Sequence, residues 1–155
     1  MAFTMQGRSL VKELLSPFAT TSDGKTGSYV DYNGYNRALI TFQGGVATTG
    51  DSDDTLIFQM YRVDDIAAAS AAATDHVAIT AGLVTMVAAS DSDADYGLGF
   101  IDLDLVAHGM DNGCLNVIAT PSPGAVIPCS SVIQLYNRNG VNSDTGMTIV
   151  TPASS

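Results

Sequence analysis

The acidic residues that begin at Asp91 are the first feature of this sequence that could do chemistry. Asp91, Asp93 and Asp95 occupy alternate positions, and Asp102 follows further along the chain. This spacing is similar to the start of a calcium-binding loop, in which carboxylates supply the ligands. Tyr96 stands where such a loop needs glycine, so the pattern favours a solvated acidic loop, with weak divalent-ion binding left open. The same weak possibility applies to a second acidic loop, which contains Asp51, Asp53 and Asp54.

The two histidines and two cysteines are the other candidates for chemistry. His76 and His108 lie in no motif that would pair a base with a nucleophile, so we expect no catalytic residue, no enzymatic activity and no cofactor. Cys114 and Cys129 flank a Pro-Ser-Pro-Gly turn, and antiparallel pairing of its two arms could bring them close. Buried thiols are expected in a reducing cytosol, and a disulfide formed later, outside the cell, is the alternative.

Size and charge restrict the possible functions. The chain has 155 residues, a length typical of one domain. Charged residues make up 14% of it, with 16 acidic and 6 basic side chains and a net charge of −10. Six scattered cations form no basic stripe, so nucleic-acid binding is not expected. The sequence also has no apolar run long enough to span a membrane and no signal-peptide pattern at its start.

The elements that would position these residues are short apolar segments between polar turn clusters. Residues 55–63 form the clearest strand, with Leu56, Phe58 and Met60 on one face. Residues 83–88 are expected to pair with residues 76–80 around Ala81-Gly82, and residues 106–113 to form a short helical turn. The other extended segments are residues 9–15, 28–32, 37–42, 98–105, 115–120, 132–136 and 147–150, the last as a strand or an arm. About eight short strands predict an all-β, antiparallel sandwich that is jelly-roll-like.

The predicted organisation has three parts. Residues 1–20 form an N-terminal arm or a first strand, residues 21–150 form the β-sandwich domain, and residues 151–155 form a flexible tail. An alanine-rich insert at residues 66–74 is expected to be a loop between strands.

Two groups of side chains are candidate contacts with other chains. The first is apolar and lies near the N-terminus: Leu10, Val11, Leu14 and Leu15. An arm formed by residues 1–15 would place this group across a neighbouring chain, whereas an ordinary first strand would place it in the sandwich. The second group is Tyr29, Tyr32 and Tyr35, which could be a contact patch or the edge of the core.

A family resemblance covers residues 25–140, with the apolar segment before them. Its motifs, in chain order, are Leu10-Val11 and Leu14-Leu15, Tyr35-x-x-Ala38-Leu39-Ile40, Asp54-Thr55-Leu56-x-x-Gln59, Phe100-Ile101-Asp102-Leu103-x-Leu105, Asp111-Asn112-Gly113, and Leu115-Asn116-Val117-x-Ala119-Thr120-Pro121. In pattern and order of elements, this resembles the small head decoration (cement) proteins of tailed bacteriophages and prophages.

The resemblance implies a non-enzymatic virion protein on the outer surface of a DNA-filled head, made in the host cytoplasm. Its partner would be the major capsid protein, it would form a homotrimer, and it would contact neither nucleic acid nor membrane. Two alternatives remain at this stage. One is a head–tail joining or tail-associated protein that forms rings. The other is a carbohydrate- or cell-surface-binding module that uses the tyrosines and calcium.

Overall fold

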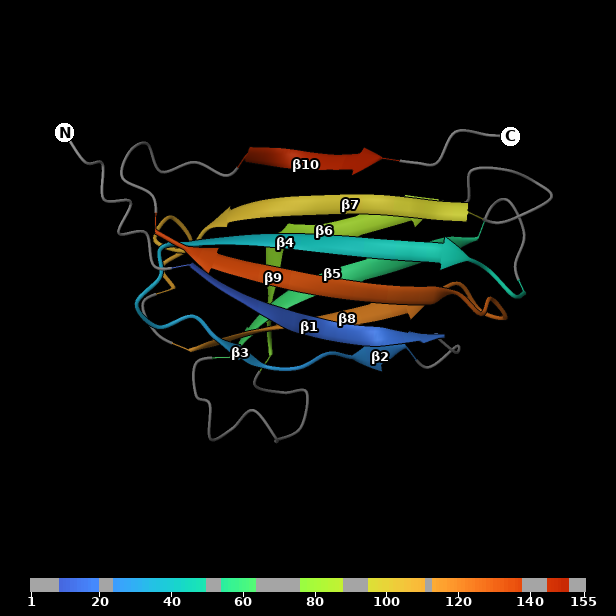
Figure 1. The fold of residues 1–155 in the computed structure, drawn as a ribbon, viewed down its shortest axis with the longest axis horizontal. Coiled ribbons are helices and arrows are strands. Elements are labelled where there is room, and N and C mark those ends of the chain that lie inside the picture. Colours follow the sequence, from blue (N-terminus) through green and yellow to red (C-terminus); the bar gives the residue numbers. More distant parts are fainter. Residues whose placement is uncertain are drawn as a thin grey trace.

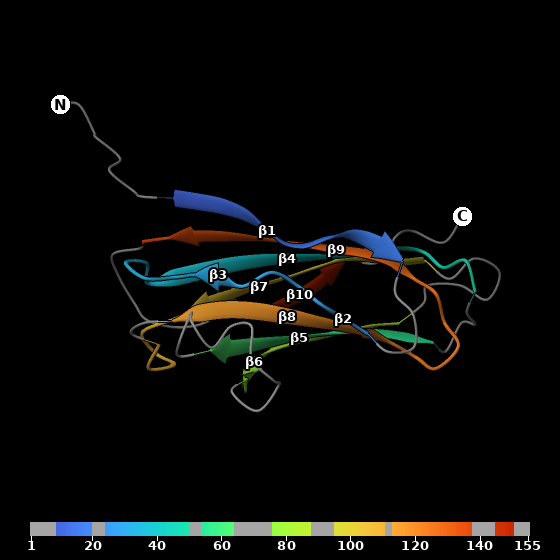
Figure 2. The ribbon, with the colours of Figure 1, turned by 90° about the horizontal axis from the view of Figure 1, so that it is seen from below.

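The computed structural model describes residues 9–19, 24–49, 54–63, 76–87, 95–110, 113–137 and 145–150, and gives only the backbone for residues 95–96 and 145–150. These residues form two antiparallel sheets packed face to face, so the predicted all-β sandwich is confirmed (Figures 1 and 2). The strands are β1 (Ser9–Ala19), β2 (Lys25–Thr26), β3 (Val30–Asp31), β4 (Arg37–Val46), β5 (Thr55–Val63), β6 (Val77–Val87), β7 (Asp95–Asp104), β8 (Cys114–Pro121), β9 (Pro128–Tyr136) and β10 (Thr145–Val150).

Strands that are distant in the sequence are neighbours in both sheets. Sheet A has the order β1-β9-β4-β7-β10, and sheet B has the order β2-β8-β5-β6, with the short β3 also paired to β8. The longest ladder of sheet A joins β4 to β7, and all the described pairs of this sheet are antiparallel. Such pairing requires the chain to cross between the sheets repeatedly, and this makes the fold rich in non-local contacts.

Alternation of apolar and polar residues explains the core between the sheets. β5 begins and ends at the predicted residues, and Leu56, Phe58 and Met60 are fully buried. In β7, Ile101 and Leu103 also point inward, as their alternation predicts. The rings of Phe42 from sheet A and Phe58 from sheet B lie 4.9 Å apart between centroids, which places an aromatic contact at the centre of the core.

The N-terminal segment is the first strand of the sandwich and not a separate arm over the part that the structure describes. β1 pairs with β9 along its length, with register shifts after Glu13 and after Leu15. These shifts let Leu14 and Leu15, although adjacent, both become buried. Of the two alternatives predicted for residues 1–20, residues 9–19 follow the first strand, since they belong to sheet A. Residues 1–8 lie outside the described residues.

The prediction of two strands around Ala81-Gly82 is wrong. β6 is one strand of 11 residues, and Gly82 lies within it. A Cβ at Gly82 would come 2.5 Å from the Cβ of Met60, so this glycine permits close approach of β5 and does not form a turn. The register with β5 shifts between Gln59 and Tyr61, and the Gln59 side-chain amide donates to the carbonyl of Ile79 near this irregularity.

The remaining predictions have mixed outcomes. Residues 105–109 form hydrogen-bonded turns that include a bond from the His108 N–H to the Asp104 carbonyl, the spacing of a single helical turn, and Gly109 has a φ of 64°. Residues 111–112 of the predicted turn lie outside the described residues. Residues 145–150 form the last strand, paired to β7. The alanine-rich insert at residues 66–74 and the tail at 151–155 lie outside the described residues. Within the described part of the chain, no helix has the length and apolar character needed to cross a membrane.

Candidate contact surface

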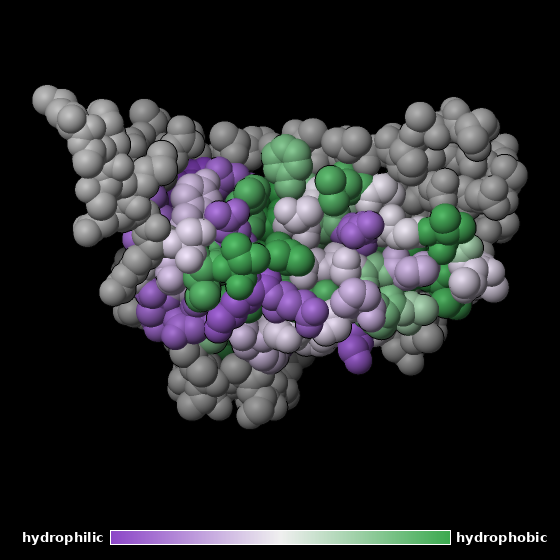
Figure 3. Space-filling view, viewed as in Figure 1, coloured by the Kyte–Doolittle hydropathy of each residue, from purple (hydrophilic) through white to green (hydrophobic). Residues whose placement is uncertain are grey.

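The face of sheet A that points away from sheet B carries apolar side chains on four adjacent strands. We call this set, Val11, Leu39, Leu98, Phe100 and Val132, the sheet A outer face. Val11 is 61% exposed and Val132 is 42% exposed, while Leu39 and Phe100 are half-buried. Figure 3 shows apolar side chains of this side of the molecule among polar ones.

Strand register explains why these residues share one surface. Gln134 of β9 lies opposite both Val11 and Leu39, and Thr41 of β4 lies opposite both Val132 and Phe100. Directly opposed residues in antiparallel strands point to the same face, so these apolar side chains lie among the uncharged Gln134 and Thr41. Glu13 of β1, opposite Val132, adds one negative charge at the edge of this face. The arrangement suits a contact that relies on apolar burial and hydrogen bonds.

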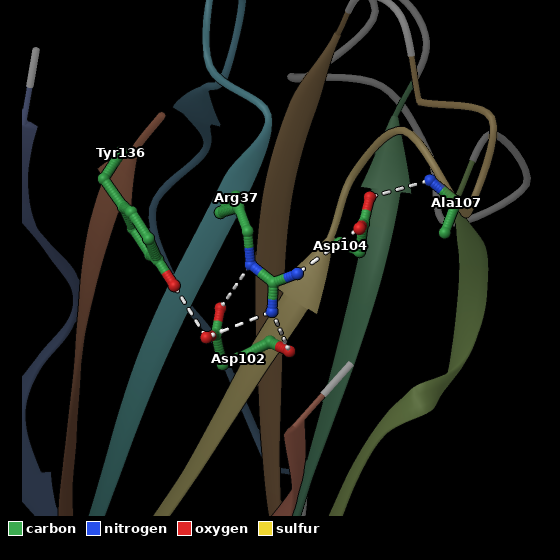
Figure 4. A network of polar contacts seen from close by, with 5 residues as sticks. All are labelled: Arg37, Asp102, Asp104, Ala107 and Tyr136. Atoms are coloured by element: carbon green, nitrogen blue, oxygen red, sulfur yellow. Dashed lines mark hydrogen bonds and ion pairs between the residues drawn. The ribbon is translucent and has the colours of Figure 1, made fainter. Parts of the chain in front are cut away.

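One end of the same face holds a buried polar cluster, which we call the Arg37 network. Its members are Arg37 from β4, Asp102 and Asp104 from β7, and Tyr136 from β9 (Figure 4). Arg37 Nε lies 3.1 Å from Asp102 Oδ1, and Nη1 lies 3.3 Å from Asp104 Oδ2. The Tyr136 hydroxyl donates to Asp102 Oδ2 at 2.6 Å, and the Ala107 N–H donates to Asp104 Oδ1 at 2.9 Å.

Burial and hydrogen bonding set the protonation of this network. Arg37 is only 2% exposed, and burial alone would lower its pKa, but hydrogen bonds to Asp102 and Tyr136 outweigh burial and raise it. Burial raises the pKa of Tyr136, and its hydrogen bond to Asp102 raises it further. Arg37 thus stays cationic and Tyr136 stays a donor at neutral pH. The network joins three strands of sheet A and has the character of a structural connection.

The structure divides the predicted N-terminal contact residues. Val11 is exposed on the sheet A outer face, so it remains a candidate contact. Leu14 and Leu15 are buried in the core of this chain, and Leu10 packs partly against it. The prediction needs correction for Leu14 and Leu15, because they are buried against sheet B within this chain. Leu10, opposite Leu135 on the inward side of β1, is half-buried.

The three tyrosines also separate. Tyr32 is fully buried and Tyr35 packs partly against the core, so both belong to the core edge. The Tyr29 hydroxyl lies 2.8 Å from His76 Nε2, and the two rings stack with centroids 5.7 Å apart. Tyr61 also contacts His76, with its ring centroid 5.7 Å from that of the imidazole. The predicted tyrosine patch is therefore not one surface.

The cysteines are both free and both buried. Cys114 begins β8 in sheet B, whereas Cys129 lies in β9 in sheet A, because the chain crosses between the sheets after Pro121. The two arms of the turn are not paired with each other, so the antiparallel pairing that could have brought the thiols close does not form. Burial raises the pKa of Cys129 to about 12, which keeps its thiol protonated and unreactive.

The acidic loops fall largely outside the described residues. This applies to Asp51, Asp53, Asp91 and Asp93, and to the side chain of Asp95. Among the residues whose side chains are described, no group of three or more His, Cys, Asp or Glu could hold a metal ion. His108 lies in the turns after β7, beside a small hollow of about 200 Å³ that Arg62 and Met110 also line.

Sequence reasoning did not find the Arg37 network. A faint signal existed, since Asp102 and Asp104 alternate with Ile101 and Leu103 in a strand that is otherwise apolar. Carboxylates at such positions need a cation or several donors when they are buried. The cation lies far away in the sequence, and only the β4–β7 register brings Arg37 opposite Asp104.

Comparisons with known proteins give similarity at the level of fold. No protein-family model matches this sequence, and no curated protein matches it. The structure is similar to a crystal structure of the infectious bursal disease virus VP2 subviral particle, with a TM-score of 0.45 and 10% identity over 89% of this chain and 34% of that one. It is also similar to a structure of the infectious bursal disease virus Gx strain, with a TM-score of 0.38 and 14% identity over 87% of this chain and 34% of that one. The chain thus spans about a third of the length of both.

Proposed function

We propose that this chain is a virion structural protein that binds the outer surface of a tailed-phage head and braces contacts between major capsid subunits. The sheet A outer face is the observation that supports this proposal. It presents Val11, Leu98 and Val132 to solvent on a rigid sheet. Exposed apolar side chains among mainly uncharged polar ones are suited to burial against another protein.

The charge distribution agrees with a position outside the head. A net charge of −10 opposes adhesion to DNA, whose phosphates are also negative. Few charged side chains, 14% of the chain, also reduce the desolvation cost of packing against neighbours. The role that we propose needs no catalytic group, no metal and no cofactor.

Bracing would depend on repetition of one modest contact. A head contains many copies of the same capsid subunit, so each bound copy of this chain would meet an equivalent surface. A trimer would contact several capsid subunits at once. Once one copy is bound, the other two are held close to their own sites at a high effective concentration, so the trimer would bind far more strongly than one copy. The Arg37 network would support this role, because it fixes three of the four strands that carry the sheet A outer face.

Co-sedimentation with heads tests the proposal. The purified chain is mixed with expanded, undecorated heads of the tailed phage or prophage whose genome carries its coding sequence. We expect it to sediment with the heads in a fixed ratio to capsid subunits and to raise the temperature at which they rupture. Absence of the chain from heads and from purified virions contradicts the proposal. Rings of six or twelve copies seen by mass photometry would favour the head–tail joining alternative.

A further inference from the structure

A hollow lies beside the sheet A outer face, where β1 and β4 end and β9 begins, at the right in Figure 1. Its volume is about 210 Å³, and its apolar lining comes from Pro17 and Phe18 of β1 and Pro128 of β9. None of the described residues that line it is charged. An apolar hollow next to a contact surface is a place where a side chain of a partner can be buried.

The pairing of β1 with β9 explains why there is space at this point. Leu15 lies opposite Ser131 and Phe18 lies opposite Cys129, so two residues of β1 stand against Ser130 alone. Such a bulge bends the strand and interrupts the ladder. The side chains on either side of it are therefore spread apart, and the hollow lies between them.

The hollow opens on the same side of the sheet as the sheet A outer face. Ser130 lines it and lies two positions before Val132 in β9, and Gln43 lines it and lies opposite Ser130. Residues two positions apart in a strand, and residues directly opposed across a ladder, point to one face. The hollow is therefore continuous with the surface that we propose as the contact with the head.

Gly45 is the residue that leaves this space open. Neither its backbone conformation nor its described neighbours require glycine, because its φ is not positive and a Cβ here would lie 3.5 Å from the Cβ of Pro128, an ordinary contact. At Gly82, in contrast, a Cβ would come 2.5 Å from the Cβ of Met60. Glycine within a strand lowers stability and often marks a place where another molecule approaches closely. Gly45 therefore indicates space for a group from outside this chain.

Size and lining define the kind of group that fits. A cavity of about 150 Å³ can hold a benzene molecule, whereas sites for drug-sized ligands have about 300–1,000 Å³. A hollow of about 210 Å³ thus suits one aromatic side chain. Phe18 and the two prolines would contact the ring, and Gln43 and Ser130 can accept a hydrogen bond from a phenol hydroxyl or an indole N–H.

A second copy of this chain offers no such group among the residues whose side chains are described. Each described Phe and Tyr is buried or half-buried, and the exposed large apolar side chains are valines and leucines. We propose that the hollow is the anchor site of the head contact and binds one tyrosine or tryptophan side chain that projects from a major capsid subunit. Aromatic anchors seated in pockets often supply much of the energy of a contact. This inference rests on the proposed function and names the chemistry of the partner within it.

Substitutions at Gly45 test the anchor site by co-sedimentation with undecorated heads. Gly45→Phe fills the hollow from within the chain, so we expect binding to heads at least about tenfold weaker than that of the parent. Gly45→Ala adds only a methyl group and should change binding by less than about threefold. Leu83→Phe is the matched control, since it places the same ring on an exposed strand residue of sheet B, and it should bind as the parent does. If Gly45→Phe does not fold, Ser130→Phe fills the hollow from β9 and replaces it.

Indole is a probe of the hollow in the absence of heads. It is titrated into the isotopically labelled chain, and amide signals are followed by NMR spectroscopy. We expect shifts of the Gly45 and Ser130 signals in the parent and in Leu83→Phe, and no shift at Ser130 in Gly45→Phe. The proposal requires both this loss of shifts and the weaker binding to heads, and failure of either overturns it. Self-association of the parent that Gly45→Phe abolishes, measured by sedimentation velocity, also overturns it, because a second copy then occupies the hollow.

Failure of this inference is distinguishable from failure of the proposed function. If only the anchor site is wrong, the parent and Gly45→Phe sediment equally well with heads. If the proposed function is wrong, neither the parent nor any variant sediments with heads, whereas indole still shifts the signals of Gly45 and Ser130 in the parent.

Discussion

Charged groups are usually exposed and apolar groups buried, but the outer surface of sheet A has the opposite arrangement at its two ends. At one end, the charged Arg37 network is buried and its groups bind one another. Toward the middle and the other end, Val132 and Leu98 are exposed. The same strands, β4, β7 and β9, supply both regions, so the difference arises from which residues alternate outward at each point.

The two regions therefore have different roles: the Arg37 network stabilises the fold, and the exposed apolar side chains are available to contact another protein. Charges that are buried with well-placed partners make the fold sensitive to removal of any one of them. Exposed apolar side chains contribute little to the stability of the chain alone, but they provide area that a partner can bury. Substitutions at the two ends should therefore have opposite effects on stability and on binding.

Removal of the arginine should have the largest effect on stability. Arg37→Ala leaves Asp102 and Asp104 buried without their cation, and we expect a loss of about 3–5 kcal/mol in the free energy of unfolding. Urea denaturation followed by circular dichroism measures it. Lys12→Ala is the control, because it removes an exposed cation and should change stability by less than about 0.5 kcal/mol. A loss below about 1 kcal/mol for Arg37→Ala would contradict the structural role of the network.

Alkaline pH should lower the stability of the fold through Cys129, which lies on the buried side of β9, opposite to the side that carries the exposed Val132. Below pH 9 the Cys129 thiol is protonated in both states, and between pH 9.0 and about 12 only the unfolded chain ionises. Stability should therefore fall as pH rises through this range, by about 2–3 kcal/mol at pH 11. Cys129→Ala should lose that part of the pH dependence, although its cavity lowers stability at every pH. Equal slopes of stability against pH in the two proteins would contradict the prediction.

A smaller effect is expected from the phenol of the Arg37 network. Tyr136→Phe removes the hydrogen bond to Asp102 and should cost about 1.5 kcal/mol at neutral pH. Because the pKa of Tyr136 is raised above 10.0, its contribution is complete below pH 10 and decreases as pH rises further. Denaturation at pH 8 and pH 11 should show a smaller difference between mutant and parent at pH 11. A constant difference would show that the hydroxyl does not titrate in this way.

Local alternation made much of the sandwich predictable from the sequence. The pattern of β5 alone placed Leu56, Phe58 and Met60 in the core, and the structure confirms it. A glycine between apolar segments normally indicates a turn, so the sequence predicts one at Gly82, whereas in the structure this glycine allows Met60 to approach. The burial of both Leu14 and Leu15 depends on register shifts in β1, which the sequence does not display.

The candidate surface was less predictable than the fold. The apolar N-terminal segment points to Val11, but nothing in the local sequence marks Val132, Leu98 and Phe100 as contact residues. Their shared surface depends on pairing between β1, β9, β4 and β7, which are far apart in the sequence. The same holds for Arg37, whose partners lie 65 and 67 positions away. Strand order, and not residue type, was the missing information.

The smallest effect on stability and the largest on binding should come from the exposed region. Val132→Lys places a cation on the sheet A outer face, where it stays solvated in the free chain, so the free energy of unfolding should change by less than about 0.5 kcal/mol. In contact with a capsid subunit the same cation would be desolvated, and co-sedimentation with heads should be lost. Arg37→Ala, measured at a temperature where it stays folded, should still bind. If Val132→Lys binds heads as the parent does, the contact lies on another surface, and the division between a stabilising end and a binding region fails.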